Sequence, residues 1–512
     1  MTSQLQQIDR EIAYWKRERL KLLHPLRQLF WECTLRCNMH CLHCGSDCKT
    51  DTITPDMPLE QFLPVLDEIK LHQTHVPMLV NTVGGEPLVR KDIIECGRAI
   101  TERGFYWGTV SNGYLLDDAM TRALVGAGLR TIAIDVDGPR EDHNWLRANP
   151  HSFDRALQAI TCLQRHPRLT WDVITCVNKR NFRHLEETKR LLIEAGVKKW
   201  RCFTIIPMGR AKKQPDMLLT DEEFKELMEF IVRTRREGKI MLNYSCEGYL
   251  GDYEGRARTN HFACHAGLTV ASILSNGDVS GCLSIRSHYK QGNIFSDGSF
   301  WDIWQNRFEK YRDHSWMQTG QCASCDVWHY CQGNGMHLRN DDGSLMLCHL
   351  DKLRKAETAA QEETNNKEKN KPIMNKEETS KNNINDVEGI ITSDNTSIPG
   401  SKSANDELEV EVDKNDVIHA VLDNNVHIND DGSIEVVDIE DMSVTVYGPP
   451  SWFEENDVII DTDPITGEPS TINPITGEIV TGDPNTLKID DMPDVYGPDP
   501  SLIDDTQVID NN

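Results

Sequence analysis

The chain has 512 residues, of which 81 are acidic and 55 basic, so its formal net charge is −26. This length allows roughly two to four domains. No run of residues is apolar enough to cross a bilayer, and no secretion signal or lipid-anchor motif is visible. We therefore expect a cytoplasmic protein that binds neither membranes nor nucleic acid.

Composition divides the chain into two parts. All 16 cysteines lie at or before Cys348, whereas the stretch from Ala356 to Asn512 contains 37 acidic and 8 basic residues. The acidity therefore belongs to the C-terminal stretch, and residues 1–355 are nearly neutral. Many cysteines without a secretion signal indicate metal binding in a reducing compartment rather than disulfides.

Strand and helix patterns alternate after an amphipathic N-terminal helix at residues 1–25, to which we assign no chemistry. Six strand-to-helix repeats predict a parallel sheet with right-handed crossovers. Six units cannot close an eight-stranded barrel, so we expect an open, partial (β/α)6 barrel over residues 26–245. Strands are expected at 27–32, 76–83, 105–111, 130–136, 169–177 and 199–206, and helices at 58–72, 90–103, 116–127, 152–166, 182–195 and 221–237.

Three cysteines follow the first expected strand in the pattern Cys37-x3-Cys41-x2-Cys44. Three thiolates can bind three irons of a cubane [4Fe–4S] cluster and leave the fourth iron open for another ligand. Zinc is the alternative, because it takes cysteine and histidine ligands and both His40 and His43 lie in the same loop.

Glycine, asparagine and acidic residues follow the other strands, where the loops of a β/α barrel form the active site. The segments are Gly84-Gly85-Glu86-Pro87, Ser111-Asn112-Gly113, Asp135-Val136-Asp137-Gly138, Asn178-Lys179-Arg180-Asn181 and Pro207-Met208-Gly209-Arg210. Each alone is compatible with an ordinary turn. Six such loops at one rim, counting the cysteine loop, indicate a functional site.

The cysteine spacing and the Gly-Gly-Glu-Pro segment resemble those of the radical S-adenosylmethionine (SAM) superfamily, and the resemblance covers residues 26–350. It implies the partial-barrel fold and a SAM molecule bound to the open iron. It further implies that residues 84–87 contact the amino group of SAM and that Arg147 contacts its carboxylate. Asp135 stands where relatives often have serine; it could accept ribose hydroxyls but would repel the carboxylate. We also expect Asn112 at the cofactor site, with His43 near the adenine or shielding the cluster.

A second cysteine array resembles the SPASM domain, an extension of radical SAM peptide and protein maturases that carries auxiliary [4Fe–4S] clusters. The resemblance assigns Cys322, Cys325, Cys331 and Cys348 to one cluster, with zinc as the alternative. It assigns Cys264 and Cys282 to another, with Cys246 as a third ligand. The family has a further cysteine at the position of Gly335, so this set is incomplete; its cluster could have three protein ligands, include a non-cysteine ligand, bind substrate or be absent. Ser275-Asn276-Gly277-Asp278 predicts a hairpin turn within this domain, at 246–355. Six cysteines fit no ligand spacing and are interpreted mainly as small buried residues: Cys33, Cys48, Cys96, Cys162, Cys176 and Cys202.

The acidic stretch from 356 to 512 has too few large apolar residues to offset chain entropy, and we expect it to be disordered. It contains two Pro-Ile-Thr-Gly-Glu segments, at 464–468 and 474–478, and two Tyr-Gly-Pro segments, at Tyr447 and Tyr496. These repeats are compatible with low-complexity drift or with a substrate-like segment fused to its own enzyme.

The resemblance implies an enzyme that cleaves SAM to a 5′-deoxyadenosyl radical and modifies a ribosomally made peptide or protein. The branch most like residues 245–349 is linked to small lipoprotein or peptide precursors. Partners would be that substrate, a flavodoxin or ferredoxin as electron donor, and in cis the tail. The alternatives are a formylglycine-forming sulfatase maturase, disfavoured because Leu283 replaces the acid that follows the equivalent of Cys282, and a non-catalytic iron–sulfur scaffold or electron-transfer protein.

Overall fold

The computed structural model describes residues 4–73, 78–245, 247–285 and 289–369, together with short strands at 426–428, 434–436, 460–462, 469–472 and 479–481. By contacts, the chain forms one compact unit up to Pro450 and a second from Ser451 onward. The two units are treated separately below.

One sheet of ten strands organises the first unit, in the order β10-β9-β8-β1-β2-β3-β4-β5-β6-β7. Strands β1 to β7 are all parallel to their neighbours, with one helical crossover between each pair. The predicted open barrel of six β/α units is therefore confirmed, and β7 adds a seventh strand. The strands are β1 (Gln28–Thr34), β2 (Leu79–Gly84), β3 (Tyr106–Ser111), β4 (Leu129–Asp135), β5 (Thr170–Val177), β6 (Lys199–Thr204), β7 (Met241–Tyr244), β8 (Val270–Ile273), β9 (Asp278–Ser280) and β10 (Gly292–Asn293).

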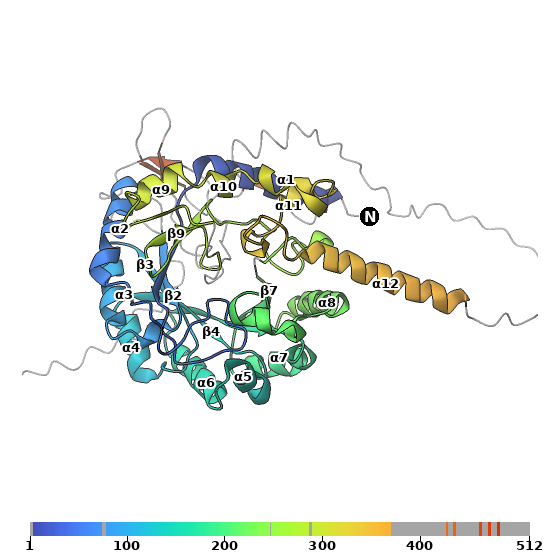
Figure 1. Ribbon diagram of the computed structural model, residues 1–512, viewed down its shortest axis with the longest axis horizontal. Coiled ribbons are helices and arrows are strands. Elements are labelled where there is room, and N and C mark those ends of the chain that lie inside the picture. Colours follow the sequence, from blue (N-terminus) through green and yellow to red (C-terminus); the bar gives the residue numbers. More distant parts are fainter. Residues whose placement is uncertain are drawn as a thin grey trace, which may run out of the picture. The chain divides into compact units, whose positions relative to one another are not determined.

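Helices α2 to α8 form an arc around the outside of the parallel strands (Figure 1). Six agree in position with the sequence prediction, whereas α5 was not predicted as a helix. The helices are α1 (Gln4–Leu23), α2 (Leu59–His72), α3 (Ile93–Glu102), α4 (Asp118–Gly126), α5 (Arg140–Arg147), α6 (Ser152–Leu163), α7 (Leu185–Glu194), α8 (Asp221–Glu237), α9 (Phe300–Asn306), α10 (Glu309–Arg312), α11 (Trp328–Cys331) and α12 (His349–Lys369).

The helices bury one apolar face against the sheet, and the sheet is buried on that side throughout. All seven residues of β1 are buried. Its Trp31 stacks on Phe62 of α2 with ring centroids 4.1 Å apart. Burying one such aromatic side chain contributes about 1.5–3 kcal/mol. Helix α8 begins at a capping box, in which Thr220 and Glu223 each accept a hydrogen bond from the other's backbone N–H.

The cysteine-rich part continues the barrel sheet instead of forming a sheet of its own. Strand β8 pairs in parallel with β1, with Gln28 opposite Val270 and Trp31 opposite Ile273. Strands β8 and β9 then form the predicted hairpin. Its turn contains Gly277 at φ +85°, a left-handed conformation that favours glycine. The boundary expected at residue 246 is therefore crossed by continuous strand pairing.

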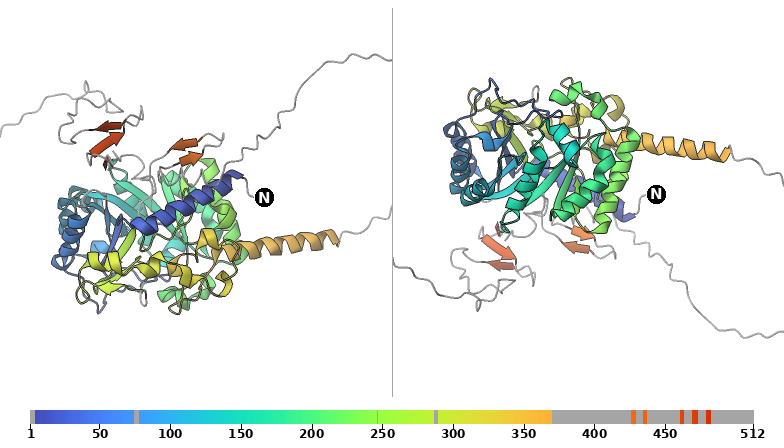
Figure 2. Two further views of the ribbon diagram at one scale, coloured as in Figure 1. Left: turned by 90° about the horizontal axis from the view of Figure 1, so that it is seen from above. Right: turned by 90° about the horizontal axis from the view of Figure 1, so that it is seen from below.

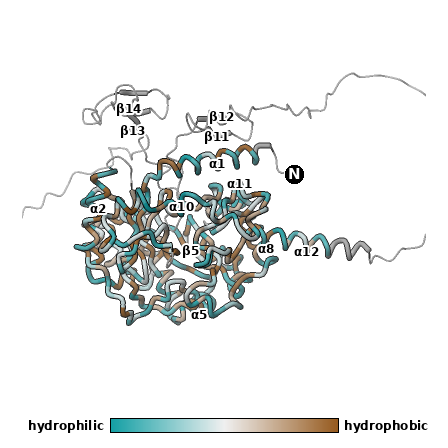
Figure 3. The backbone as a smooth tube through the Cα atoms, turned by 45° about the horizontal axis from the view of Figure 1, so that its top comes forward, coloured by the Kyte–Doolittle hydropathy of each residue, from teal (hydrophilic) through white to brown (hydrophobic). Residues whose placement is uncertain are grey.

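Helix α12 crosses the boundary expected at residue 356. Its first turns are held against α8, where Lys352 Nζ donates to Leu219 O and to Asp221 Oδ1 at 3.0 and 2.8 Å. The rest of α12 extends away from the barrel as a mostly hydrophilic helix (Figures 2 and 3). Disorder beyond Lys369 stays a prediction.

Five short strands are described further along the chain. In the first unit β11 (Val426–Ile428) pairs with β12 (Ile434–Val436), and in the second β13 (Ile460–Thr462), β14 (Pro469–Ile472) and β15 (Ile479–Thr481) form an antiparallel meander. Both Pro-Ile-Thr-Gly-Glu repeats, Tyr447 and Tyr496 lie outside the described residues. None of the described helices combines the length and apolarity that crossing a membrane requires.

Candidate active site and auxiliary cysteine sites

The three cysteines of the first motif lie in the loop after β1 and line one cavity of about 290 Å³. The loop is held by backbone hydrogen bonds, including Cys37 N to Lys49 O at 3.0 Å and Cys44 N to Cys41 O at 3.3 Å. Burial raises the pKa of Cys37 to about 12 and that of Cys41 to about 11. Hydrogen bonds from Cys48 outweigh burial at Cys44 and lower its pKa to about 6. The loop thus brings together three thiol groups at the carboxyl ends of the strands.

The loop after β6 packs against the cysteine loop and holds it by hydrogen bonds. Arg210 donates through Nε to Cys41 O at 2.7 Å and through Nη1 to Cys48 O at 2.8 Å. Gly209 has φ +53°, and a Cβ there would lie 2.3 Å from the carbonyl oxygen of Gly45. The predicted motif at 207–210 therefore positions the cysteine loop.

The Gly-Gly-Glu-Pro segment shapes the cavity with its glycines. Gly84 and Gly85 line the cavity. A Cβ on Gly85 would lie 2.1 Å from Arg36 O, and one on Gly84 would lie 2.1 Å from Thr34 O. Both positions therefore require glycine, because the backbone of the cysteine loop passes so close that a Cβ atom would overlap its carbonyl oxygens.

Glu86 points into the protein and does not line the cavity. Its carboxylate accepts hydrogen bonds from Asn112 N, Ser111 Oγ and Leu88 N at 2.7, 2.9 and 3.1 Å. Burial raises the pKa of Glu86 to about 7, against the opposing effect of these donors. Pro87 begins a short 3-10 turn behind the loop. In this structure the Glu86 carboxylate therefore orients the loop after β3.

Asn112, in that loop, lines the cavity beside the cysteines. Its Nδ2 donates to Asn38 Oδ1 at 2.7 Å and lies 4.0 Å from Cys37 Sγ. The carbonyl oxygen of the Asn112 side chain accepts from Tyr114 N at 3.0 Å, and a role of Asn112 in cofactor binding stays a prediction.

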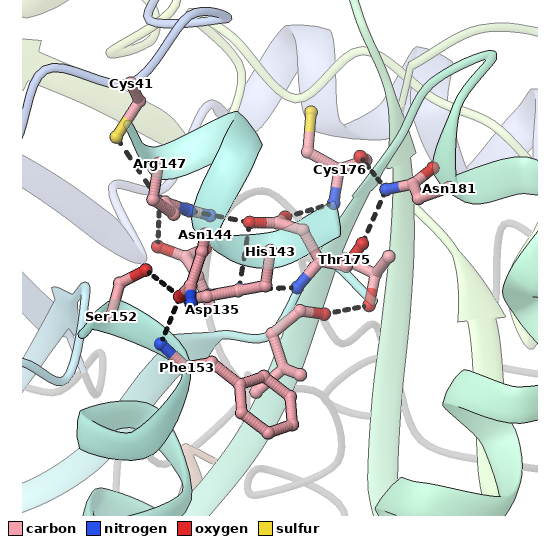
Figure 4. A network of polar contacts seen from close by, with 12 residues as sticks. Cys41, Asp135, His143, Asn144, Arg147, Ser152, Phe153, Thr175, Cys176 and Asn181 are labelled. Carbon is pink, nitrogen blue, oxygen red and sulfur yellow. Dashed lines mark hydrogen bonds and ion pairs between the residues drawn. The ribbon is translucent and has the colours of Figure 1, made fainter. Parts of the chain in front are cut away.

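Arg147 lies at the end of α5 and is buried, not solvated (Figure 4). Its Nε donates to Asp137 Oδ2 at 2.6 Å and its Nη1 to Asp135 Oδ2 at 2.9 Å, while Nη1 lies 4.0 Å from Cys41 Sγ. Burial raises the pKa of Asp135 against the effect of Arg147. Burial is the largest effect on Asp137 and opposes its ionisation, but the charge of Arg147 and the smaller contributions of its other neighbours together lower the pKa of Asp137. Asp135, which we expected to repel the carboxylate of SAM, is therefore paired with the guanidinium of Arg147.

His43 lines the same cavity. Burial, reinforced by the charge of Arg147, lowers its pKa to about 3, so the imidazole is neutral. Its Nδ1 is buried without a hydrogen-bond partner in the described part of the chain. The ring is therefore placed to contact a molecule in the cavity.

Several lining residues escaped the sequence analysis. Cys48 and Cys176, interpreted as candidates for simple burial, line the cavity, whereas Cys33, Cys96, Cys162 and Cys202 are buried in the structure as expected. Glu247 also lines it, although no motif surrounds it in the sequence. Its Oε2 accepts from Thr204 N, Thr204 Oγ1 and Tyr244 OH at 2.8, 2.6 and 2.5 Å. Burial raises the pKa of Glu247 to about 7.

The four cysteines at the end of the second array come together in space. The charges of Cys348, Cys322 and Cys325 all act on Cys331, whose pKa burial raises to about 12. A side chain from the same segment also reaches the group, since Arg339 Nη2 lies 3.5 Å from Cys322 Sγ. Four thiols gathered from a Cys-x2-Cys-x5-Cys segment and from the start of α12 suit a four-ligand cluster.

Cys264 and Cys282 form a second group. Burial raises the pKa of Cys282 to about 12, and the charge of Cys264 raises it further. Cys246, the expected third ligand, lies outside the described residues. In the described part of the chain no three His, Cys, Asp or Glu side chains converge tightly enough to hold a single metal ion. A cubane makes a different demand, because each thiolate binds a different iron.

Helix α1 packs against this cysteine-rich part. Arg17 is buried and donates to Tyr330 O at 2.6 Å and to His329 O at 3.1 Å. Its charge interacts with Cys331 and Cys264. The N-terminal helix, to which we assigned no chemistry, thus brings a buried cation close enough to interact with one cysteine of each auxiliary group.

Comparison with protein-family models supports the class that this geometry suggests. Residues 31–192 match the model described as the radical SAM superfamily, and residues 264–326 match SPASM, described as an iron-sulfur cluster-binding domain. The chain therefore contains a radical SAM domain and a SPASM domain; it is an enzyme, and its cofactors are [4Fe–4S] clusters and SAM.

Two curated relatives have different functions. The chain is 27% identical to the AdoMet-dependent heme synthase of Methanosarcina barkeri, over 60% of this chain and 90% of that protein. It is 28% identical to the mycofactocin maturase MftC of Mycolicibacterium smegmatis, over 60% of this chain and 78% of that protein. A solved structure, native anSMEcpe with bound AdoMet, aligns over 68% of this chain and 100% of that chain with a TM-score of 0.52 and 17% identity, which shows a shared fold.

Proposed function

We propose that the enzyme modifies a ribosomally made peptide or protein by hydrogen abstraction, as a cytoplasmic protein. The observation that carries this proposal is the construction of the catalytic cavity. Barrel loops form one wall, while Glu247, Leu283 and Ser284, from the segments that open the cysteine-rich extension, form another. In this proposal the cysteine-rich extension would contribute to the part of the cavity that receives the substrate. MftC, which is named a maturase, is similar to this chain over 78% of its own length.

The residues of the cavity suit the cofactors. Cys37, Cys41 and Cys44 would bind three irons, leaving one iron open toward the cavity. Gly84, Gly85, Asn112, Asp135, Arg147 and His43 would surround SAM, with Glu86 and Pro87 supporting the loop from behind. When bound, the cluster and SAM supply a 5′-deoxyadenosyl radical that takes a hydrogen atom from a substrate carbon. The chain itself orients both groups: Arg210 fixes the cysteine loop, and Arg147 balances the negative charges next to Cys41.

The auxiliary sites would handle electrons after the hydrogen is removed. Cys322, Cys325, Cys331 and Cys348 would hold one cluster, and Cys264 and Cys282 with Cys246 would hold part of another. A flavodoxin or ferredoxin would supply the electron that starts the reaction. Anaerobically reconstituted enzyme is then expected to contain two or three clusters per chain, measured by iron and sulfide content.

A second candidate substrate is an iron porphyrin with carboxylate side chains. The observation in its favour is the similarity to a heme synthase, which spans 90% of that protein. Both candidates share radical formation and differ in what enters the cavity.

One experiment separates the two. The enzyme is incubated with SAM and reductant, together with either a small peptide encoded next to its gene or iron-coproporphyrin III, and each mixture is analysed by mass spectrometry. A changed peptide mass with unchanged porphyrin supports the proposal. Loss of carbon dioxide from the porphyrin with an unchanged peptide would replace it by the second candidate.

The tail would act as a substrate in cis. Tyr447 and Tyr496 each stand in a Tyr-Gly-Pro segment that resembles a precursor peptide. Full-length enzyme incubated with SAM and reductant should then lose two hydrogens in peptides that contain either tyrosine, as in oxidative crosslinking. If both peptides keep their encoded mass while a separate peptide is modified, the tail is not a substrate.

A further inference from the structure

Two neighbouring loops at the carboxyl end of the parallel strands are rich in basic side chains. They are the loop after β5, at 178–184, and the loop after β6, at 205–218. Their cations are Lys179, Arg180, Arg183, Arg210, Lys212 and Lys213, and Asp216 is their one acidic residue. The two loops are in contact, because Lys179 N donates a hydrogen bond to Met217 O at 2.9 Å. Together they form a positively charged surface, which we term the basic rim.

Most of the positive charge of the basic rim is not neutralised by the described part of the chain. Arg180 is paired with Asp142 and Arg210 with Asp47. The side chains without a hydrogen bond or ion pair to any described residue are Lys179, Arg183, Lys212 and Lys213. Three of these four are exposed, and Lys179 is half-buried. Such a group of uncompensated cations creates a local positive potential that attracts an acidic partner.

The basic rim is joined directly to the loop that carries the catalytic cysteines. Arg210 N donates to Cys44 O at 3.0 Å, and Arg210 Nε donates to Cys41 O at 2.7 Å. Met217, in the same loop after β6, belongs to a small buried apolar cluster against which Leu42 of the cysteine loop packs. Hydrogen bonds and apolar packing therefore hold the rim in a fixed position next to the cysteine loop.

The cysteine loop is itself accessible from outside beside the basic rim. Its residues His40 and Gly45 are exposed, whereas Cys41 between them is buried. Electron transfer between two proteins becomes faster as their redox groups come closer. A protein bound at the basic rim would approach the catalytic cysteines from outside, and it would not have to enter the cavity that receives SAM and the substrate.

Two acidic occupants of the basic rim have to be compared. One is the acidic segment of the chain itself, at 356–512, which contains 37 acidic and 8 basic residues. The other is an acidic protein that carries an electron. The position of the rim favours the second occupant, because the cations lie next to the loop of Cys41 and Cys44, where an electron has to be delivered. Neutralising the acidic segment would not require the cations to lie at this place.

We propose that the basic rim is the docking surface for an acidic electron-carrier protein. The proposal rests on the electron donor of the proposed function, to which it adds a binding site, and it is independent of the substrate. The carrier is oxidised by one electron, and that electron reduces the cluster held by Cys37, Cys41 and Cys44, with no transfer of a proton or a chemical group. Complementary charges increase the rate of association and orient the two proteins.

Binding is measured first, by anaerobic titration of the holoenzyme with a fluorescently labelled bacterial flavodoxin. The double variant Lys212→Glu with Lys213→Glu should raise the Kd about tenfold at low salt, and high salt should remove most of this difference. The control is Lys198→Glu with Lys239→Glu, which changes the charge equally at two exposed positions before β6 and β7, at the opposite end of the strands. The control should bind flavodoxin as tightly as the parent.

Turnover is measured second, as the formation of 5′-deoxyadenosine from SAM without any substrate. The reductant is either reduced flavodoxin or titanium(III) citrate, a small molecule that needs no docking surface. The double variant at Lys212 and Lys213 should be slower than the parent with flavodoxin and equally fast with titanium(III) citrate. A parent that forms no 5′-deoxyadenosine with either reductant would contradict the radical reaction proposed above, while the binding measurement would still decide about the basic rim.

Four results would overturn the proposal. The first is a parent enzyme that binds neither flavodoxin nor a ferredoxin. The second is an equal effect of the rim variant and the control variant on the Kd. The third is slower turnover of the rim variant with both reductants, because Lys212 and Lys213 would then support the site and not a partner. The fourth is a higher affinity of the rim variant for flavodoxin, which would assign the basic rim to the acidic segment of the chain itself.

Discussion

At the scale of single residues, the site depends on buried charges that only the folded chain brings together. Arg147 is 6% exposed and pairs with Asp135 and Asp137, both contributed by the end of β4 and the loop after it. Removing one partner from a buried ion pair leaves an uncompensated charge in a low dielectric.

Arg147→Met should therefore lower the stability of the protein by about 3–5 kcal/mol, and it should also weaken SAM binding. The control is Arg140→Met on the same helix, which breaks an exposed pair with Asp154 and should change little. Anaerobic denaturant unfolding measures the first effect, and the spectral change that SAM causes in the reduced cluster measures the second. Equal stability of the two variants would show that the buried pairs do not contribute as described.

Gly85 offers a second test at this scale. From the sequence, a larger side chain would be expected to block SAM while leaving the cluster bound. In the structure a Cβ meets Arg36 O at 2.1 Å, directly before Cys37. Gly85→Ala should therefore displace the cysteine loop and reduce the iron content by up to about one cluster. Gly126→Ala in α4, where a Cβ meets nothing within 4 Å, is the matched control. Full iron content in Gly85→Ala would show that the loop adapts.

At the scale of elements, helix α1 is predicted to influence the auxiliary clusters through Arg17. A buried cation near cluster ligands favours the reduced, more negative state. Arg17→Met should therefore lower the midpoint potential of the auxiliary clusters, while Arg19→Met, a half-buried arginine of the same helix, should leave it unchanged. A redox titration followed by EPR checks this. Identical potentials in both variants would exclude an electrostatic role of α1.

The sequence predicted the elements well and their contacts poorly. Period-two and helical patterns place the strands and helices, because each buries one face against the same sheet. The cysteine spacing identifies the site because cluster geometry restricts it. The sequence did not indicate a role for Glu247, because its hydrogen-bond partners Thr204 and Tyr244 come from β6 and β7. No local sequence pattern predicts contacts between residues of different strands. The direction of the Glu86 side chain could not be predicted from the sequence for the same reason.

At the scale of the whole molecule, the barrel and the cysteine-rich part share one sheet, which predicts how truncations behave. A chain ending after Lys369 should keep its clusters and its thermal midpoint. A chain ending after Ser245 should be insoluble, because it lacks β8 and exposes the edge of β1. Iron content and size-exclusion chromatography distinguish these results. A soluble, monomeric chain that ends after Ser245 would contradict a structural role for β8.

The pairing of β1 with β8 also determines how long the first strand of a newly made chain must wait for its partner. Gln28 leaves the ribosome long before its partner Val270 is synthesised. At the usual rate of translation, ~5–20 residues per second, this delay is roughly 12 to 48 s. During that time one edge of the first strand has no partner, although every one of its residues is destined for the interior. Chaperones that protect unpaired strand edges should therefore bind the nascent chain until β8 has emerged.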